Sequence, residues 1–173
     1  MKLSIQQLNQ LAPAEFVILL GGVFESAPWV AQKVVGKRPF RDREHVLRLM
    51  CDALRRAGPE KQLELIRAHP DLVGEAARSG QLSTASTREQ TGAGLLNLST
   101  EDARWFERYN RAYREKYGFP FVFCVRAFKP AAIQRAILDS FEMRLHNDDQ
   151  RERDTALGEV GKIAEFRLRD LVA

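Results

Sequence analysis

The chain has 173 residues, of which 45% are hydrophobic and 29% are charged, a balance that argues against extended disorder. The 27 Lys and Arg residues and the 23 Asp and Glu residues leave a formal net charge of +4, and the two signs interleave, as in residues 151–154. A nucleic-acid-binding protein gathers its basic residues on one face, so this pattern argues against that class.

Neither a leader peptide nor a membrane span is expected. The first residues lack a basic stretch followed by an apolar run, and no apolar run approaches the length of a membrane helix. Cys51 and Cys124 lie far apart in apolar surroundings, which indicates reduced thiols. We therefore expect a cytoplasmic protein without a metal centre, which contacts no membrane and no nucleic acid.

Caps, prolines and apolar spacing predict a series of helices in the N-terminal part of the chain. The expected helices are one after the Ser4–Gln7 capping box, one from Pro13 to near Gly21, one capped by Ser26, one over about 42–57 and one over 59–68.

The C-terminal part of the sequence predicts further helices and one run that is not helical. The expected helices are a short one over 87–96, a long one capped by Ser99 with an aromatic stripe, one that starts at Pro130 and one over about 150–171. Residues 117–125 form the only run that resembles a strand, and no second run could pair with it. The sequence therefore predicts an all-α fold in a single compact domain over residues 1–173.

A polar segment from Ala68 to Gln90 is the best candidate for one wall of a small-molecule site. Pro70 forces His69 out of the preceding helix, and a Gly/Ser/Thr-rich stretch follows it. A histidine at such a position serves either structure or acid–base chemistry. His45, on an amphipathic helix, and His146, near a helix C-terminus, are better explained as solvated residues.

Two charged residues each allow two interpretations. Glu89 is either the last residue of a capping box that starts at Ser86, or a carboxylate that accepts hydrogen bonds from a ligand. Arg167 lies on the apolar face of the last helix, where it either reaches out to water or turns inward to hold a carboxylate. If Arg167 does not bind the anion, Arg126 and Arg144 are the next candidates.

The buried segment over residues 119–125 is also a candidate. A buried backbone outside helices and sheets needs hydrogen-bond partners, and a heterocycle with amide groups can supply some of them. The sequence contains no P-loop, no GxGxxG after a strand, no GxSxG elbow and no HExxH. The enzyme classes that remain therefore use neither a nucleotide nor a metal.

The motifs of this chain resemble those of OHCU decarboxylase, which acts on 2-oxo-4-hydroxy-4-carboxy-5-ureidoimidazoline (OHCU). The resemblance spans nearly the whole chain. The motifs that carry it are LLGGVFESAPWVA at 19–31, RPF at 38–40, ELIRAHPDL at 64–72, STREQ at 86–90, AGL at 93–95, FPFV at 119–122 and IAEFRL at 163–168.

The resemblance implies an all-α homodimer without a cofactor that converts OHCU to (S)-allantoin, the last step from urate. It implies that His69 is the catalytic acid or base, with Pro70 beside it. Glu89 and Arg167 would also be catalytic, Arg167 by holding a substrate anion. Ser86, Glu89 and Gln90 would bind the ring and the ureido group. The backbone that contacts the amide edge of the substrate would come from Phe121, Val122, Phe123, Cys124 and Val125.

Two other functions remain open at this point. A hydrolase of a related ureide or cyclic imide would use His69 to activate water, and it would release no CO2. A helical binding module would present a basic stripe and bind with a strong dependence on salt.

Overall fold

The computed structural model describes residues 2–173, which divide into two compact units. Unit 1 contains the described residues up to Ala68 together with Gly161–Ala173, and unit 2 contains His69–Val160. Helices fill both units and no strand occurs among residues 2–173, so the all-α prediction is confirmed. The single domain over residues 1–173 stays a prediction.

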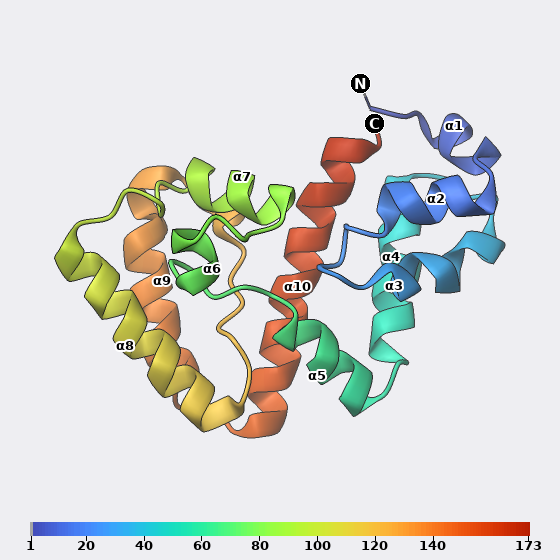
Figure 1. Ribbon diagram of the computed structural model, residues 1–173. Coiled ribbons are helices and arrows are strands. Elements are labelled where there is room, and N and C mark those ends of the chain that lie inside the picture. The colour runs from blue at the N-terminus through green and yellow to red at the C-terminus, as the bar shows by residue number, and fades with distance from the viewer. Residues whose placement is uncertain (1) are drawn as a thin grey trace. The chain divides into compact units, whose positions relative to one another are not determined.

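Unit 1 is built from the N-terminal helices and the end of the last helix (Figure 1). Its elements are α1 (Ile5–Gln10), α2 (Pro13–Leu20), α3 (Pro28–Val34), the short 3-10 helix η1 (Val35–Lys37), α4 (Arg43–Arg55), α5 (Pro59–Arg67) and the C-terminal part of α10 (Asp149–Leu171). Helix α3 packs against both α2 and α4. An isolated bridge between Leu3 and Val172 joins the start of the described chain to its end.

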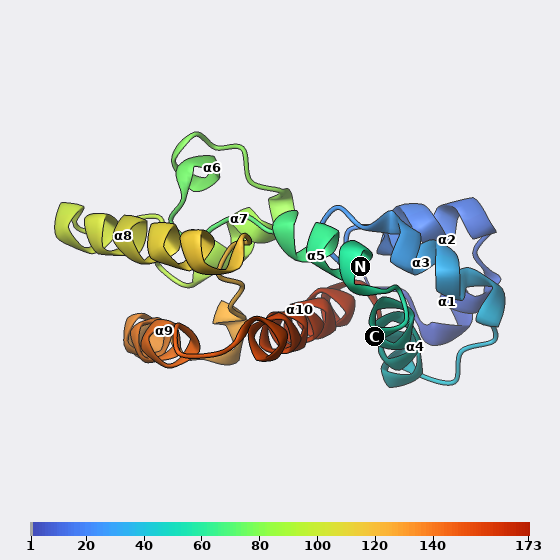
Figure 2. The same ribbon diagram turned by 90° about the horizontal axis from the view of Figure 1, so that it is seen from below.

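Unit 2 holds the middle of the chain and the first part of α10. Its other elements are α6 (Glu75–Arg78), α7 (Thr84–Gly92), α8 (Thr100–Tyr117), the 3-10 helix η2 (Val125–Ala127) and α9 (Pro130–Arg144). Helices α8 and α9 are both labelled in Figure 2. They pack through aromatic rings: the ring centroid of Phe141 lies 5.8 Å from that of Trp105 and 5.3 Å from that of Tyr109. The predicted aromatic stripe therefore forms this contact.

The local signals for helix starts agree with the structure in most places. Ser4 and Ser99 cap α1 and α8 through their side chains, and prolines open α2, α5 and α9 as expected. The cap predicted at Ser26 is wrong, because α3 begins after Ala27, whose side chain makes no cap. Ser26 instead has a φ of 51°. Across residues 2–173, no helix combines the length and apolar character needed to cross a membrane.

Candidate active site

His69 is the first residue of unit 2 and follows Ala68, the C-cap of α5. Only 5% of its surface is exposed. Proline restricts the residue before it to extended geometry, so Pro70 ends the helix and leaves His69 outside it, as predicted. A buried imidazole at the start of a loop is placed for acid–base chemistry only if the loop itself is rigid.

Helix α8 holds this loop from one side. Asp71 accepts two hydrogen bonds from Nε of Arg114, at 2.9 and 3.1 Å. The buried side chain of Asn110 donates from Nδ2 to the carbonyl of Leu72 at 2.9 Å. Asn110 was not predicted, although a polar residue on the aromatic stripe of α8 was a signal for it. These three hydrogen bonds fix the loop just beyond His69.

Helix α7 holds the same loop through Gln90. Its Oε1 accepts from the backbone N–H of Val73 at 3.0 Å, and its Nε2 donates to the carbonyl of Asp71 at 3.4 Å. Val73 has a φ of 56°, which is strained for a β-branched residue and costs about 1–3 kcal/mol. Such a conformation persists only where the surroundings impose it, and Gln90 supplies part of that constraint.

Helix α7 starts three residues earlier than its sequence suggested. Ser83 is the N-cap, and its hydroxyl accepts from the N–H of Ser86 at 3.2 Å. The capping box predicted from Ser86 to Glu89 is therefore wrong. Ser86 and Gln90 are buried one turn apart, and the half-buried Glu89 lies beside them in the second turn. Glu89 therefore does not close a capping box with Ser86.

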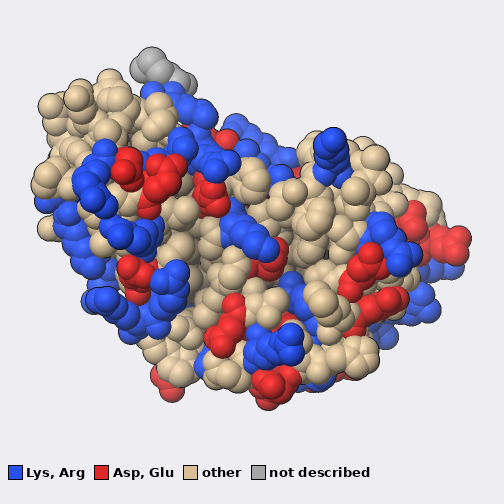
Figure 3. All heavy atoms as spheres, turned by 180° about the vertical axis from the view of Figure 1, so that it is seen from behind, with Lys and Arg blue, Asp and Glu red and all other residues tan. Residues whose placement is uncertain are grey.

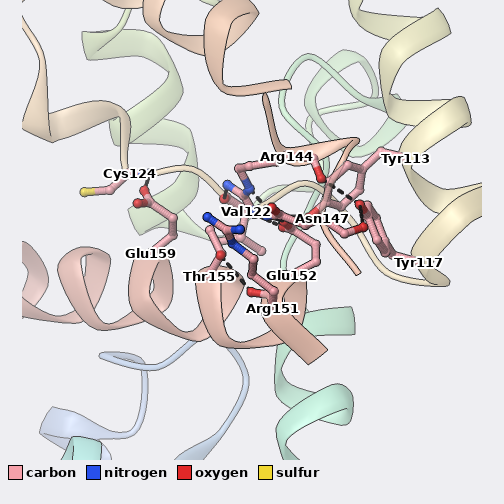
Figure 4. Close-up of polar contacts among 10 residues, drawn as sticks. All are labelled: Tyr113, Tyr117, Val122, Cys124, Arg144, Asn147, Arg151, Glu152, Thr155 and Glu159. Atoms are coloured by element: carbon pink, nitrogen blue, oxygen red, sulfur yellow. Dashed lines mark hydrogen bonds and ion pairs between the residues drawn. The ribbon is translucent and has the colours of Figure 1, made fainter. Parts of the chain in front are cut away.

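The segment from Phe121 to Val125 is buried, as predicted, and it is non-helical up to Cys124, whereas Val125 begins the 3-10 helix η2. It follows α8, which ends at Gly118 in a left-handed conformation with a φ of 71°. Two of its backbone groups are bound by side chains of unit 2 (Figure 4): Arg144 donates to the carbonyl of Val122 at 2.7 Å, and Glu159 accepts from the N–H of Cys124 at 2.8 Å. The segment runs into η2, which packs against α7.

Arg167 belongs to unit 1 and is only 5% exposed, so the interpretation that it reaches out to water is wrong. Its Nη1 forms an ion pair with Glu25 at 2.7 Å and donates to the carbonyl of Gly22 at 3.3 Å. Glu25 was not predicted, although an acid inside the apolar 19–31 motif was a signal for it. The buried guanidinium therefore has a carboxylate partner within unit 1.

His45, His146 and Arg144 contact groups of the protein itself. Nδ1 of the half-exposed His45 accepts from the backbone N–H of Arg41 at 3.2 Å, and the exposed His146 contacts the carbonyl of Glu142 at 2.7 Å. Arg144, a reserve candidate for the anion, is instead buried in an ion pair with Glu152. Neither histidine therefore competes with His69.

On the face drawn in Figure 3, basic and acidic side chains are interspersed, as the sequence suggested. Within residues 2–173, no group of three or more His, Cys, Asp or Glu residues is arranged to hold a metal ion.

Unit 2 therefore brings together an imidazole on a fixed loop, the polar face of α7 and a buried extended backbone. These groups can exchange a proton, accept and donate hydrogen bonds, and bind amide groups. Unit 1 holds a buried guanidinium that can bind a carboxylate.

Comparison with known proteins agrees with this chemistry. Residues 9–169 match the OHCU decarboxylase family. A 2-oxo-4-hydroxy-4-carboxy-5-ureidoimidazoline decarboxylase of Haloferax volcanii is 41% identical over 169 residues, which is 98% of this chain and 96% of that protein. The corresponding mouse protein is 38% identical over 96% of this chain and 91% of its own length. A crystal structure of (S)-allantoin synthase superposes with a TM-score of 0.76 at 25% identity, over 97% of this chain and 54% of that one.

The fold and these relatives place the chain among the all-α decarboxylases. It belongs to the OHCU decarboxylase family.

Proposed function

We propose that this protein decarboxylates OHCU to (S)-allantoin, the last step in the conversion of urate to allantoin. The observation that carries the proposal is the buried His69 on a loop clamped by Asn110 and Gln90, in a chain of this family. The clamp gives the imidazole a fixed position relative to α7, as stereospecific proton transfer requires.

The substrate supplies its own electron sink. The bond between the ring carbon and the carboxylate breaks, CO2 leaves, and the bonding electron pair moves into the adjacent imine of the ring. The imine nitrogen takes up a proton, and the carbon that lost CO2 is left as an enol. A proton is then added to the neighbouring carbon, the one that bears the ureido group, while the enol hydroxyl loses its proton and becomes the ring carbonyl of allantoin. The protein needs only to orient the carboxylate, polarise the ring and deliver the proton to one face. No cofactor is needed for this reaction.

His69 is the acid or base in this proposal, because a neutral imidazole has a pKa suited to proton transfer near pH 7. Pro70 lines the site beside it. Ser86, Glu89 and Gln90 bind the ring and the ureido group. The two amide atoms of Gln90 already hold the loop, yet each has capacity for one more hydrogen bond.

Arg167 is proposed to bind the substrate anion, as the resemblance implies. In the absence of substrate its guanidinium is paired with Glu25. An arginine has five N–H donors in a planar fork, so it can bind several acceptors at the same time. The backbone over residues 121–125 is proposed to contact the amide edge of the substrate. We further propose a cytoplasmic homodimer, which sedimentation velocity would test.

The deciding experiment generates OHCU enzymatically from urate and follows circular dichroism and CO2 release after this protein is added. Spontaneous decay gives racemic allantoin, so we expect the protein to produce an optically active signal with one CO2 released per allantoin. If OHCU is consumed without release of CO2, the protein is a ureide hydrolase. If the added protein changes neither signal, the proposed function is wrong.

A further inference from the structure

The extended segment of unit 2 is attached to a buried ionic network. Arg144 is 2% exposed and Glu152 is 0% exposed. Nε and Nη2 of Arg144 donate to Oε1 of Glu152 at 2.9 and 2.6 Å, and Nη2 also contacts the hydroxyl of Tyr113 at 3.1 Å (Figure 4). The Tyr113 hydroxyl donates to the same carboxylate, and Asn147 donates to its other oxygen at 2.7 Å.

A network of this kind is not explained by stability alone. Packed apolar residues often stabilise a core as well as a buried ion pair does, because the charges must be removed from water. The pair does, however, fix the direction of the guanidinium. The remaining Nη1 donates to the carbonyl of Val122 at 2.7 Å, and the guanidinium lies 4.4 Å above the ring of Phe121. The network therefore ends on the backbone of the extended segment.

A second carboxylate holds the same segment two residues later. Oε2 of Glu159, on α10, accepts from the N–H of Cys124 at 2.8 Å. Arg144 and Glu159 thus bind one group on each side of Phe123: the carbonyl of the peptide before it and the N–H of the peptide after it. In a trans peptide the C=O and N–H point in opposite directions, and both of these peptides are trans. The two tethers consequently turn the N–H and the C=O of Phe123 away from Arg144 and Glu159.

These two groups of Phe123 have no hydrogen bond to any residue between Lys2 and Ala173. Phe123 is nevertheless 7% exposed, so the groups lie in a largely buried environment where an unmade hydrogen bond is costly. One donor and one acceptor on a single residue match the N–H and C=O of an amide or a urea. The pair is therefore a ready-made partner for the ureido or ring-amide edge of a ligand.

We propose that Arg144, Glu152 and Glu159 are positioning residues that fix the two peptide planes around Phe123 and so aim its N–H and C=O at the amide edge of the substrate. Glu152 acts by holding Arg144, and none of the three touches the reacting atoms. The inference rests on the proposed function, since it assigns the N–H and C=O of Phe123 to the binding of OHCU.

The test compares Glu159→Met with Glu159→Gln. Gln keeps an oxygen that accepts from Cys124, whereas Met fills the same volume without one. Glu165→Met, at a surface position on the same helix paired with Arg169, is the matched control. We expect Glu159→Met to lower kcat/KM by about 10²-fold, mainly through KM, because a misplacement of about 1 Å costs that much. Glu159→Gln should restore most of the activity, and Glu165→Met should match the wild type.

A folded Glu159→Met variant with wild-type KM would overturn the proposal, as would a Glu159→Gln variant as impaired as Glu159→Met. A wild-type protein that does not act on OHCU would instead contradict the proposed function, so the two failures are distinguishable.

A measurement on the wild-type protein covers the case in which Glu159→Met does not fold. Amide resonances of Phe123 and Cys124 are followed by NMR during titration with (S)-allantoin. We expect the Phe123 amide to shift and to exchange more slowly with solvent when the ligand binds, while exchange at Cys124 stays slow throughout. Saturation with (S)-allantoin that leaves the Phe123 amide unchanged would overturn the assignment.

Discussion

The hydroxyl of Ser83 accepts the hydrogen bond from the N–H of Ser86, and this bond sets the start of α7. Ser86 therefore lies in the first turn of α7 rather than at its N-cap, and its side chain is buried. Glu89 follows in the second turn, out of reach of any capping function. The carboxylate therefore does not cap α7, so its part in the reaction can be tested without loss of the cap.

We predict that Glu89→Gln melts like the wild type but loses most of its activity. The substitution removes no cap, and Gln keeps the size of the side chain and an oxygen that accepts hydrogen bonds, so the free energy of unfolding should change by less than about 0.5 kcal/mol. Activity should fall by about 10²-fold or more if the charge polarises the ring. Thermal melts measure the change in stability, and the dichroism assay measures the change in activity. Wild-type kinetics in Glu89→Gln would remove the carboxylate from the reaction.

His69→Asn should abolish decarboxylation while the fold stays intact. A positioned acid or base contributes about 10²–10⁴-fold to the rate, and Asn occupies a similar volume without a titratable group. His146→Asn, at an exposed position, is the matched control and should retain activity. A His69→Asn variant with more than about a tenth of the wild-type rate would exclude acid–base catalysis by this residue.

Arg167→Lys should lower kcat/KM strongly, with part of the loss in KM. Lysine keeps the charge but cannot reproduce the planar two-point grip on a carboxylate. Loss of one charge-assisted pair in a closed site is worth about 2–4 kcal/mol. The ion pair with Glu25 gives a control, since Glu25→Gln also perturbs that pair but leaves the guanidinium intact. Kinetics of Arg167→Lys that match the wild type would contradict anion binding by Arg167.

Asn110→Leu should destabilise the loop that carries His69. The substitution leaves the carbonyl of Leu72 buried without its donor, at a cost of about 1–3 kcal/mol. We expect kcat to fall as well, because the imidazole loses a fixed position. Chemical denaturation and steady-state kinetics at a temperature where the variant is fully folded separate the two effects. A less stable variant with unchanged kcat would show that the hydrogen bond serves only the fold.

The buried phenol of Tyr113 leads us to predict that the protein becomes less stable as the pH rises above 10. Burial raises the pKa of its phenol well above 10.0, and the hydrogen bond to Glu152 acts in the same direction. Above pH 10 the unfolded chain releases this proton while the folded chain keeps it, so stability is lost as pH rises. The slope from this group approaches about 1.4 kcal/mol per pH unit. Tyr113→Phe should remove that slope between pH 10 and 11, whatever its effect at pH 7, and an unchanged slope would contradict the assignment.

The helices were predictable because their signals are local. Ser4, Ser99 and the prolines at helix starts act within one turn, so their sequence spacing is enough to place them. Ser83 caps α7, although the sequence predicted the cap at Ser86. Both serines precede a helical run, so local spacing alone does not distinguish them.

The partners of the buried charges could not be predicted from spacing. Glu25 and Arg167 lie near opposite ends of the chain, and only the assembly of unit 1 pairs them. Arg144 lies close to Glu152 in sequence, yet the pair depends on a turn between α9 and α10 that no local rule specifies. His69, by contrast, was identifiable because Pro70 acts on the residue directly before it.

The bridge between Leu3 and Val172 has a consequence for the order in which the protein folds during synthesis. The N–H of Leu3 donates to the carbonyl of Leu171, and the N–H of Ala173 donates to the carbonyl of Leu3, both at 2.9 Å. Unit 1 is thus completed by residues 161–173, which are synthesised after all of unit 2, whereas unit 2 is one uninterrupted stretch of chain. Domains form as units in the order in which they are synthesised. The loop that bears His69 can therefore take its final form while the first sixty-eight residues still await the segment that closes their own unit.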